Sequence, residues 1–249
     1  MKIIQISDSH IGHWTDATSG IDVRRNFEFI LKKIESEKPS FIIHSGDICF
    51  DIPEISIYKW VKEKLDSIQI HYSLIAGNHD DTSMICQIFD QKHQNKECYF
   101  DKIIQNKKLL FLDTANGDMS DAQYDWLTDQ LSQSEIRAIF LHHPPIKMGV
   151  PFMDQNYSFK SMEKFCSIIE QYSKPIQIFC GHYHNARSVT RKNMQVHICP
   201  STFYELNDFS DNFGMSSDRI GYRIIEIDDQ NNVKTTLKYF NGFTNPLIA

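Results

Sequence analysis

The sequence predicts an α/β fold, on three observations. Short apolar runs of strand character alternate along the chain with stretches whose apolar residues recur at helical spacing. The 249 residues are 41% hydrophobic and 23% charged, which is typical of a globular protein with a full core. Five of the strand-like runs end in Asp, Asn or His. Because ligands of α/β sheets bind beyond the carboxyl ends of the strands, the sequence also predicts a site there.

Local pattern places each element in turn. The first helix is predicted to follow Asp22, a suitable N-cap, because Phe27, Ile30, Leu31 and Ile34 share one helical face. In chain order we expect strand 2–6, helix 22–37, strand 41–43, helix 55–65, strand 71–76, strand 109–112, helix 121–131, strand 138–141, helix 159–172, strand 176–180, and strands 195–199, 222–227 and 233–239. The remaining long segments, 147–157 and 203–219, are predicted to be irregular loops. Without a repeat or a linker, residues 1–249 are expected to form a single domain.

Charge and apolar patterning exclude several classes of protein. The formal net charge of −6 disfavours a nucleic-acid partner. No apolar run reaches the roughly 18 residues that span a bilayer, and residues 1–5 do not resemble a signal peptide, so we expect a cytoplasmic protein without a membrane partner. The six cysteines form no CxxC pair and are expected to be reduced and buried.

The polar residues at the five strand ends form one candidate metal site. They are Asp8, His10, Asp47, Asn78, His79, His142, His182 and His184. Oxygen and nitrogen ligands without thiolate suit Mn, Fe, Co or Zn. The set is too large for one ion with an open position. It suits two ions roughly 3.5–4 Å apart that clamp a phosphoryl oxygen and generate a nucleophile at neutral pH.

Spacing supports this interpretation. Asp8 and His10 are separated by one residue, as are His182 and His184, so alternate side chains can point the same way. Taken singly, each Asp or Asn would more often be a helix N-cap. The joint occurrence with the histidines favours the metal site.

Five motifs resemble those of the calcineurin-like metallophosphoesterases, in the family's order. They are Asp8-Ser9-His10, Gly46-Asp47, Gly77-Asn78-His79-Asp80, His142-His143-Pro144 and Gly181-His182-Tyr183-His184. The resemblance covers about residues 2–200. It implies a four-layer sandwich of two mixed β-sheets flanked by helices, and a centre of two divalent metal ions.

The resemblance also implies ligand roles. Asp8, His10 and His184 would hold the first ion, Asn78, His142 and His182 the second, and Asp47 would bridge both. His142 rather than His143 fits the family's His-x-Pro pattern. Neighbouring strand residues also face opposite ways. Whether His143 lies near the substrate is left open.

Two further residues are expected to act in catalysis. The resemblance implies that His79 protonates the leaving oxygen, a role that suits the near-neutral pKa of histidine. Asp80 is expected to orient His79 or its loop. His44, His71, His93 and His197 lie outside the motifs and are expected to be structural or solvated.

The substrate is expected to be a small phosphodiester. Cys199-Pro200-Ser201-Thr202 and Gly221-Tyr222-Arg223 resemble stretches of the class III 3′,5′-cyclic nucleotide phosphodiesterases, which favours cyclic AMP. Asp81 stands where many members of that branch carry Arg, and Ile220 where they carry Pro.

Other functions stay open beside cyclic nucleotide hydrolysis. They are glycerophosphodiester or other phosphoester hydrolysis, a nucleic-acid end as substrate, protein phosphatase activity, and a non-catalytic scaffold. A homodimer is a further expectation from the related enzymes. The aromatic residues Trp14, Phe152, Tyr157, Phe203 and Tyr204 either pack ordinarily or stack on a base.

Overall fold

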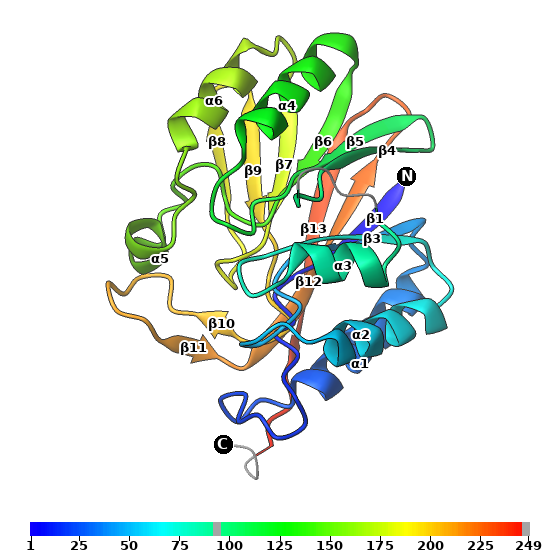
Figure 1. The fold of residues 1–249 in the computed structure, drawn as a ribbon, viewed down its shortest axis with the longest axis vertical. Helices are drawn as coiled ribbons and strands as arrows, with labels where there is room; N and C mark the ends of the chain where they lie inside the picture. The colour runs from blue at the N-terminus through cyan, green and yellow to red at the C-terminus, as the bar shows by residue number, and fades with distance from the viewer. Residues whose placement is uncertain (92–95, 246–249) are drawn as a thin grey trace.

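Two mixed β-sheets form the centre of the molecule (Figure 1). The computed structural model describes residues 1–91 and 96–245. The strand order of the first sheet is β13 (Val233–Asn241), β12 (Arg219–Ile227), β1 (Lys2–Ile6), β2 (Phe41–Ser45) and β3 (Tyr72–Ile75). That of the second is β4 (Phe100–Ile104), β5 (Lys107–Phe111), β6 (Ile136–Phe140), β7 (Ile176–Cys180), β9 (Met194–Ile198) and β8 (Ser188–Arg191).

The parallel strands of each sheet bring their carboxyl ends to one edge. The strands β1, β2 and β3 pair in parallel, and β12 and β13 extend that sheet in antiparallel fashion. In the second sheet β5, β6, β7 and β9 are parallel, with antiparallel β4 and β8 at the two edges.

Helices cover the outer faces of the sheets. The helices are α1 (Val23–Glu37), α2 (Ile55–Ser67), α3 (Thr82–Ile88), α4 (Asp121–Gln133), α5 (Pro151–Asn156) and α6 (Met162–Gln171). In Figure 1, α1, α2 and α3 lie beside the first sheet, and α4 and α6 lie over the second. Within the described residues, none of the helices combines the length and the apolar composition that crossing a bilayer requires.

The two sheets pack face to face. Ile3, Ile43 and Ile75 of the first sheet form one buried cluster with Phe111 and Phe140 of the second. Their strand neighbours Ile4 and Ile42 point the other way, into the cluster that contains the helix residues. This alternation confirms the predicted α/β sandwich of two mixed sheets flanked by helices.

An aromatic stack fixes the inner face of the second sheet. The rings of Phe100, Phe111, Phe140, Phe179 and His197 follow one another across neighbouring strands, with centroids 4.6, 5.4, 5.2 and 5.1 Å apart. The exposed fraction of His197 is 1%, and its ring nitrogens hydrogen-bond Ser188 and Gln177. The structure thus supports the expectation that His197 is structural.

Most predicted elements are present, and the differences lie in short or edge segments. The helix α3 and the strands β4 and β8 were not predicted from the sequence. The prediction that 147–157 is irregular was wrong for 151–156, which form α5. The expected loop 203–219 contains a short hairpin, β10 (Glu205–Leu206) and β11 (Met215–Ser217).

Candidate metal centre

The polar residues predicted from the motifs lie where the carboxyl ends of the two sheets meet. Asp8 and His10 follow β1, and Asp47 follows β2. The turn 77–80 follows β3, and the loops after β6 and β7 carry the remaining histidines. Parallel strand order in both sheets therefore brings together residues more than 170 positions apart in the chain, as in the hydrogen bond from His182 to Asp8.

An unusual backbone conformation turns these side chains inward. Positive φ angles occur at Asp8 (53°), His10 (44°), Asp47 (54°), His182 (72°) and His184 (57°). Residues other than glycine rarely adopt this left-handed region, and such strain gathers at functional sites. The turns are also tightly packed. A Cβ atom at Gly77 would overlap Asp47, and one at Gly181 would overlap Ser7 and Asp8.

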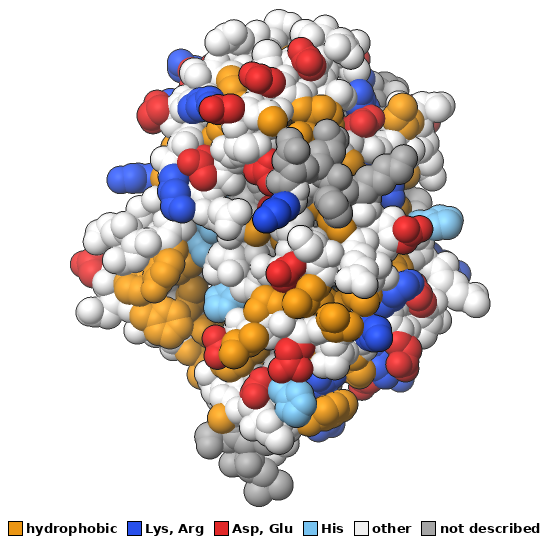
Figure 2. Space-filling view, in the orientation of Figure 1, with side chains coloured by type: hydrophobic (Ala, Val, Ile, Leu, Met, Phe, Trp, Pro, Cys, Tyr) orange, Lys and Arg blue, Asp and Glu red, His pale blue; other side chains and the backbone are white. Residues whose placement is uncertain are grey.

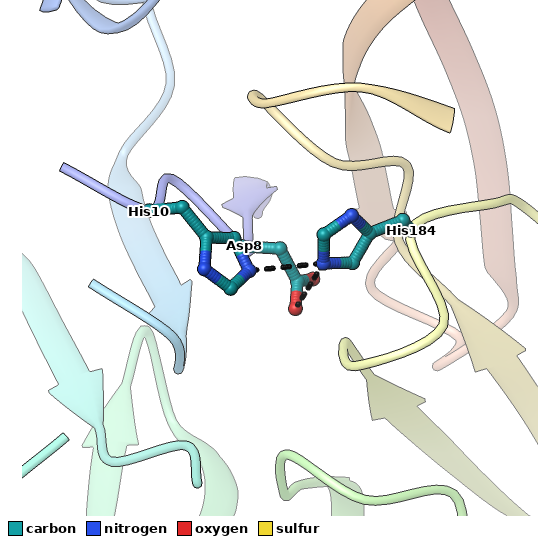
Figure 3. A group of neighbouring side chains, drawn as sticks. All are labelled: Asp8, His10 and His184. Atoms are coloured by element: carbon teal, nitrogen blue, oxygen red, sulfur yellow. Dashed lines mark hydrogen bonds and ion pairs between the residues drawn. The ribbon is translucent and has the colours of Figure 1, made fainter. Parts of the chain in front are cut away.

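One group of ligand atoms consists of Asp8, His10 and His184 (Figure 3). The Nε2 atoms of His10 and His184 lie 2.9 Å apart, and Nε2 of His184 lies 3.7 Å from Oδ1 of Asp8. Figure 3 shows the two rings and the carboxylate converging from separate loops. All three side chains are buried.

A second group consists of Asp47, His142 and His182. Nδ1 of His142 donates a hydrogen bond to the Ser45 carbonyl oxygen over 2.8 Å. Its Nε2 atom lies 3.3 Å from Oδ2 of Asp47 and has no hydrogen-bond partner among residues 1–91 and 96–245. Nε2 of His182 donates to the Tyr157 carbonyl oxygen over 2.9 Å, which leaves Nδ1 with the lone pair.

Asp47 lies between the two groups. Its Oδ2 atom is 3.7 Å from Nε2 of His10 and 3.3 Å from Nε2 of His142. Its Oδ1 atom accepts a hydrogen bond from the backbone N–H of His79 over 2.9 Å. One carboxylate oxygen of Asp47 therefore lies within 4 Å of a ring nitrogen from each group.

The electrostatics of the site suit cations. Asp8 and Asp47 are buried, and the ion pairs described for them involve histidines only. Burial raises the pKa of Asp8 to about 7. Burial lowers the pKa of His10 to about 4 and that of His182 to about 3, so these rings are neutral at pH 7 and keep a lone pair for a metal.

Asp47 and His142 form a buried pair with opposed shifts. Burial alone would raise the pKa of Asp47, but the His142 ring outweighs it and holds that pKa well below its usual value. Burial lowers the pKa of His142, but the Asp47 carboxylate outweighs it and raises that pKa to about 9. Without a metal ion, a proton on His142 supplies the positive charge. A divalent cation would fit here, because Nε2 of His142 has no hydrogen-bond partner in the described residues and the surrounding ligand atoms are oxygen and nitrogen.

Asn78, His79 and Asp80 stand on the turn after β3. Asn78 is exposed and His79 is half-buried, and both line a cavity of about 360 Å³ next to His10 and His184. The His79 ring lies 4.9 Å from the His10 ring.

The Asp80 carboxylate holds the neighbouring turns. It accepts hydrogen bonds from the backbone N–H groups of Gly77, Ile48 and Cys49 and from the Tyr58 hydroxyl. None of the hydrogen bonds described for this carboxylate involves His79. Of the two roles expected for Asp80, the contacts favour holding the loop.

The remaining histidines differ in their surroundings. His44 is buried and shares a 2.8 Å hydrogen bond with Ser9, between the first two predicted ligands. His71 is exposed, and His93 lies outside the described residues. His143 is buried, with its ring 4.2 Å from that of His182, and Nδ1 lies 3.2 Å from the Thr114 hydroxyl.

Several residues support the site through contacts that the sequence did not predict. Ser201 donates to the Asp8 carbonyl oxygen over 2.9 Å, so the stretch after β9 fastens the first ligand loop. Thr114 holds His143. Tyr157 supplies a carbonyl to His182. Thr114 follows the predicted strand 109–112 without any motif to single it out. Ser201 and Tyr157 were singled out for other roles, and a contact through a backbone carbonyl, as at Tyr157, leaves no signal in the sequence.

The aromatic residues divide into two sets. Phe203 and Tyr204 are buried and line the cavity, with centroids 5.1 Å from the rings of His10 and His184 respectively. Trp14 is 71% exposed and lies under the Arg24 guanidinium instead of lining the cavity. Tyr157 lines the cavity.

The chain is similar in sequence to a known family and to named phosphodiesterases. The family model described as calcineurin-like phosphoesterase matches residues 1–186. The chain is 30% identical over 245 residues to a probable cyclic nucleotide phosphodiesterase of Fibrobacter succinogenes, covering 97% of this chain and 94% of that protein. It is 26% identical over 223 residues to the glycerophosphodiester phosphodiesterase GpdQ of Enterobacter lignolyticus, covering 83% and 79%.

A solved structure shares the fold. A dimetal phosphatase from Danio rerio superposes with a TM-score of 0.64 at 12% identity, over 98% of this chain and 99% of that one.

Proposed function

The chain belongs to the calcineurin-like phosphoesterase family, and from that premise we propose that it is a metal-dependent phosphodiesterase whose substrate is a 3′,5′-cyclic nucleotide. The observation that carries the proposal is Asp47, which stands between two groups of buried ligands with oxygen and nitrogen donors only. The relative from Fibrobacter succinogenes, similar over 97% of this chain, supports the cyclic nucleotide as substrate.

The proposed ligand sets follow the motifs. Asp8, His10 and His184 hold one ion, Asn78, His142 and His182 hold the other, and Asp47 contacts both. The donor chemistry accepts Mn, Fe, Zn or Co. Two such cations, when bound, offset the charge of the phosphodiester and provide a nucleophile at neutral pH.

His79 is proposed to protonate the leaving oxygen. Its ring stands on the cavity wall, half-buried, next to His10. The Asp47 carboxylate holds its backbone N–H, so the ring is placed relative to the proposed bridging ligand. Asp80 acts as a positioning residue, because its hydrogen bonds join the turn that carries Asp47 to the turn that carries His79.

A glycerophosphodiester is the second candidate substrate. The similarity to GpdQ over 79% of that protein supports it. Of the other functions, a non-catalytic scaffold is disfavoured because every residue proposed as a metal ligand or proton donor is present in the sequence. A nucleic-acid end is disfavoured by the net charge of −6. The homodimer and the cytoplasmic location stay predictions of the sequence.

A substrate panel tests the proposal. The purified chain, reconstituted with manganese, is assayed in parallel against cyclic AMP, glycerophosphocholine and bis(p-nitrophenyl) phosphate. Turnover of cyclic AMP well above that of glycerophosphocholine is expected. Turnover of glycerophosphocholine alone would replace the first candidate by the second. Activity on none of the three, with two metals bound, would overturn both.

A further inference from the structure

The lining of the cavity beside the ligands combines two kinds of side chain. The polar ones are histidines, Asp47 and Asn78, which are all proposed metal ligands or the proposed proton donor. The others are apolar or aromatic, namely Phe50, Met153, Tyr157, Phe203, Tyr204, Leu206 and Phe213. This apolar part of the described lining suits a flat or apolar part of a ligand whose phosphate lies against the polar part.

Two of these aromatic side chains are held open to solvent by separate segments. Tyr157 follows α5 and is 52% exposed, and Phe213 precedes β11 and is 61% exposed. The ring of Phe152 lies 5.7 Å from each of them and joins the two segments. We call Phe152, Tyr157 and Phe213 the aromatic wall. Figure 2 shows hydrophobic side chains gathered on the left, over the region of α5 and the β10–β11 hairpin, beside histidine atoms.

The aromatic wall is fastened to the loop that carries two of the proposed ligands. The carbonyl of Tyr157 accepts from His182. On the other side, Asp208 accepts hydrogen bonds from Asn185 and, over 3.2 Å, from Arg187, which are the first and third residues after His184. Because both segments are tied to this loop, the wall keeps a fixed place relative to the ligands.

Exposed aromatic rings add little to the stability of the fold. In a polar loop such as 207–214, Phe213 has no core to fill. Exposed apolar side chains that gather at the mouth of a cavity mark a binding surface. The cavity volume of about 360 Å³ lies near the lower end of ligand sites, which favours one nucleoside unit over a larger ligand.

We propose that the aromatic wall binds the nucleobase of the substrate by stacking and that it discriminates little between bases. The inference rests on the proposed cyclic nucleotide activity and adds how the same site would select among the bases of its substrates. Every base has a π-face, so stacking tolerates all of them. A site rejects an analogue strongly when it is built to hydrogen-bond the group that differs, and the side chains of the apolar part of the lining offer only the hydroxyls of Tyr157 and Tyr204 for this purpose.

The test combines binding with turnover. Binding of 5′-AMP, 5′-GMP and inorganic phosphate to the manganese-loaded chain is measured by calorimetry, for the unmodified protein and for Phe213→Ala. Loss of one stacking ring is expected to raise the Kd of both nucleotides about 5- to 150-fold and to leave that of phosphate unchanged. For cyclic AMP hydrolysis, KM rises and kcat stays within about threefold.

Phe209→Ala is the matched control, because Phe209 belongs to the same loop and is 86% exposed but does not line the cavity. It is expected to change the nucleotide Kd less than about twofold. For the unmodified protein, Kd values of the two nucleotides within about tenfold of each other are expected.

Two results would overturn the inference: Phe213→Ala binding 5′-AMP as tightly as the control, or a preference beyond about 100-fold for one base. Failure of the proposed function is a different result, namely no hydrolysis of any cyclic nucleotide. In that case calorimetry of the two nucleotides would still show whether the aromatic wall binds a base.

Discussion

Asp154 is predicted to hold the α5 segment against the metal loop, and its replacement should cost both stability and metal affinity. The carboxylate accepts hydrogen bonds from the backbone N–H groups of Met148, Gly149 and Val150, over 3.0, 2.7 and 3.0 Å. It also accepts from the Tyr183 hydroxyl over 2.9 Å, and Tyr183 stands between two proposed ligands.

The magnitude follows from the donors that Asp154→Ala would leave without an acceptor. Met148, Val150 and Tyr183 are buried, whereas Gly149 is exposed and can be solvated. At about 1 kcal/mol for each buried donor, the free energy of unfolding should fall by about 3 kcal/mol. Tyr183→Phe removes one of these bonds and should cost about 1 kcal/mol.

The affinity for metal should fall in Asp154→Ala together with the free energy of unfolding. The α5 segment ends at Tyr157, whose carbonyl accepts from His182. Loss of such an outer partner weakens metal binding about 10- to 100-fold.

Urea unfolding of the metal-free protein, followed by manganese titration, measures both effects. Asp125→Ala on the exposed face of α4 is the matched control and should stay within about 0.5 kcal/mol. A loss below about 1 kcal/mol for Asp154→Ala would show that its hydrogen bonds do not stabilise the fold, and the reasoning would be refuted.

Three further predictions concern catalysis, the bridge and pH. His79→Ala should keep both metals and lose about 10²- to 10⁴-fold in kcat on diesters with poor leaving groups; an unchanged kcat would remove the acid role. Asp47→Ala should lose metal and activity together in elemental analysis and turnover, and a metal-replete active variant would contradict the bridge. Burial lowers the pKa of His197 to about 4 in the folded protein. As the pH falls from about 6.5 to 4, His197 is therefore protonated in the unfolded chain before it is protonated in the folded one. Unfolding free energy should therefore drop by roughly 2–3 kcal/mol over that range, and less in His197→Gln; equal slopes for the two proteins would exclude this origin.

The sequence predicted the elements whose side chains follow one strong period. Strands such as β1 and β2 are buried on both faces, so they appear in the sequence as nearly continuous apolar runs. The edge strands β4 and β8 bury one face only, and their alternation was too short to notice. The helix α5 begins at Pro151 and has six residues, which is too few to show a helical period of apolar residues. The hydrogen bonds of Asp154 to the backbone just before the helix are local, but they follow no apolar pattern.

The candidate site was visible because its residues follow apolar runs directly. Asp8 and Asp47 each come within two residues of a strand end. Their left-handed backbone, the tautomer of His142 and the carbonyl partner of His182 depend on tertiary contacts, which no local pattern reports. Phe213 did carry a signal, since an aromatic residue amid Asp, Asn and Ser has no core to enter.

The most direct test of the account is a manganese titration of the metal-free chain while cyclic AMP hydrolysis is followed. The two ligand groups, with Asp47 within reach of both, predict a rate that rises to a plateau at two equivalents of metal for each chain. Binding of two equivalents without any hydrolysis of cyclic AMP, or a plateau at one, would contradict it.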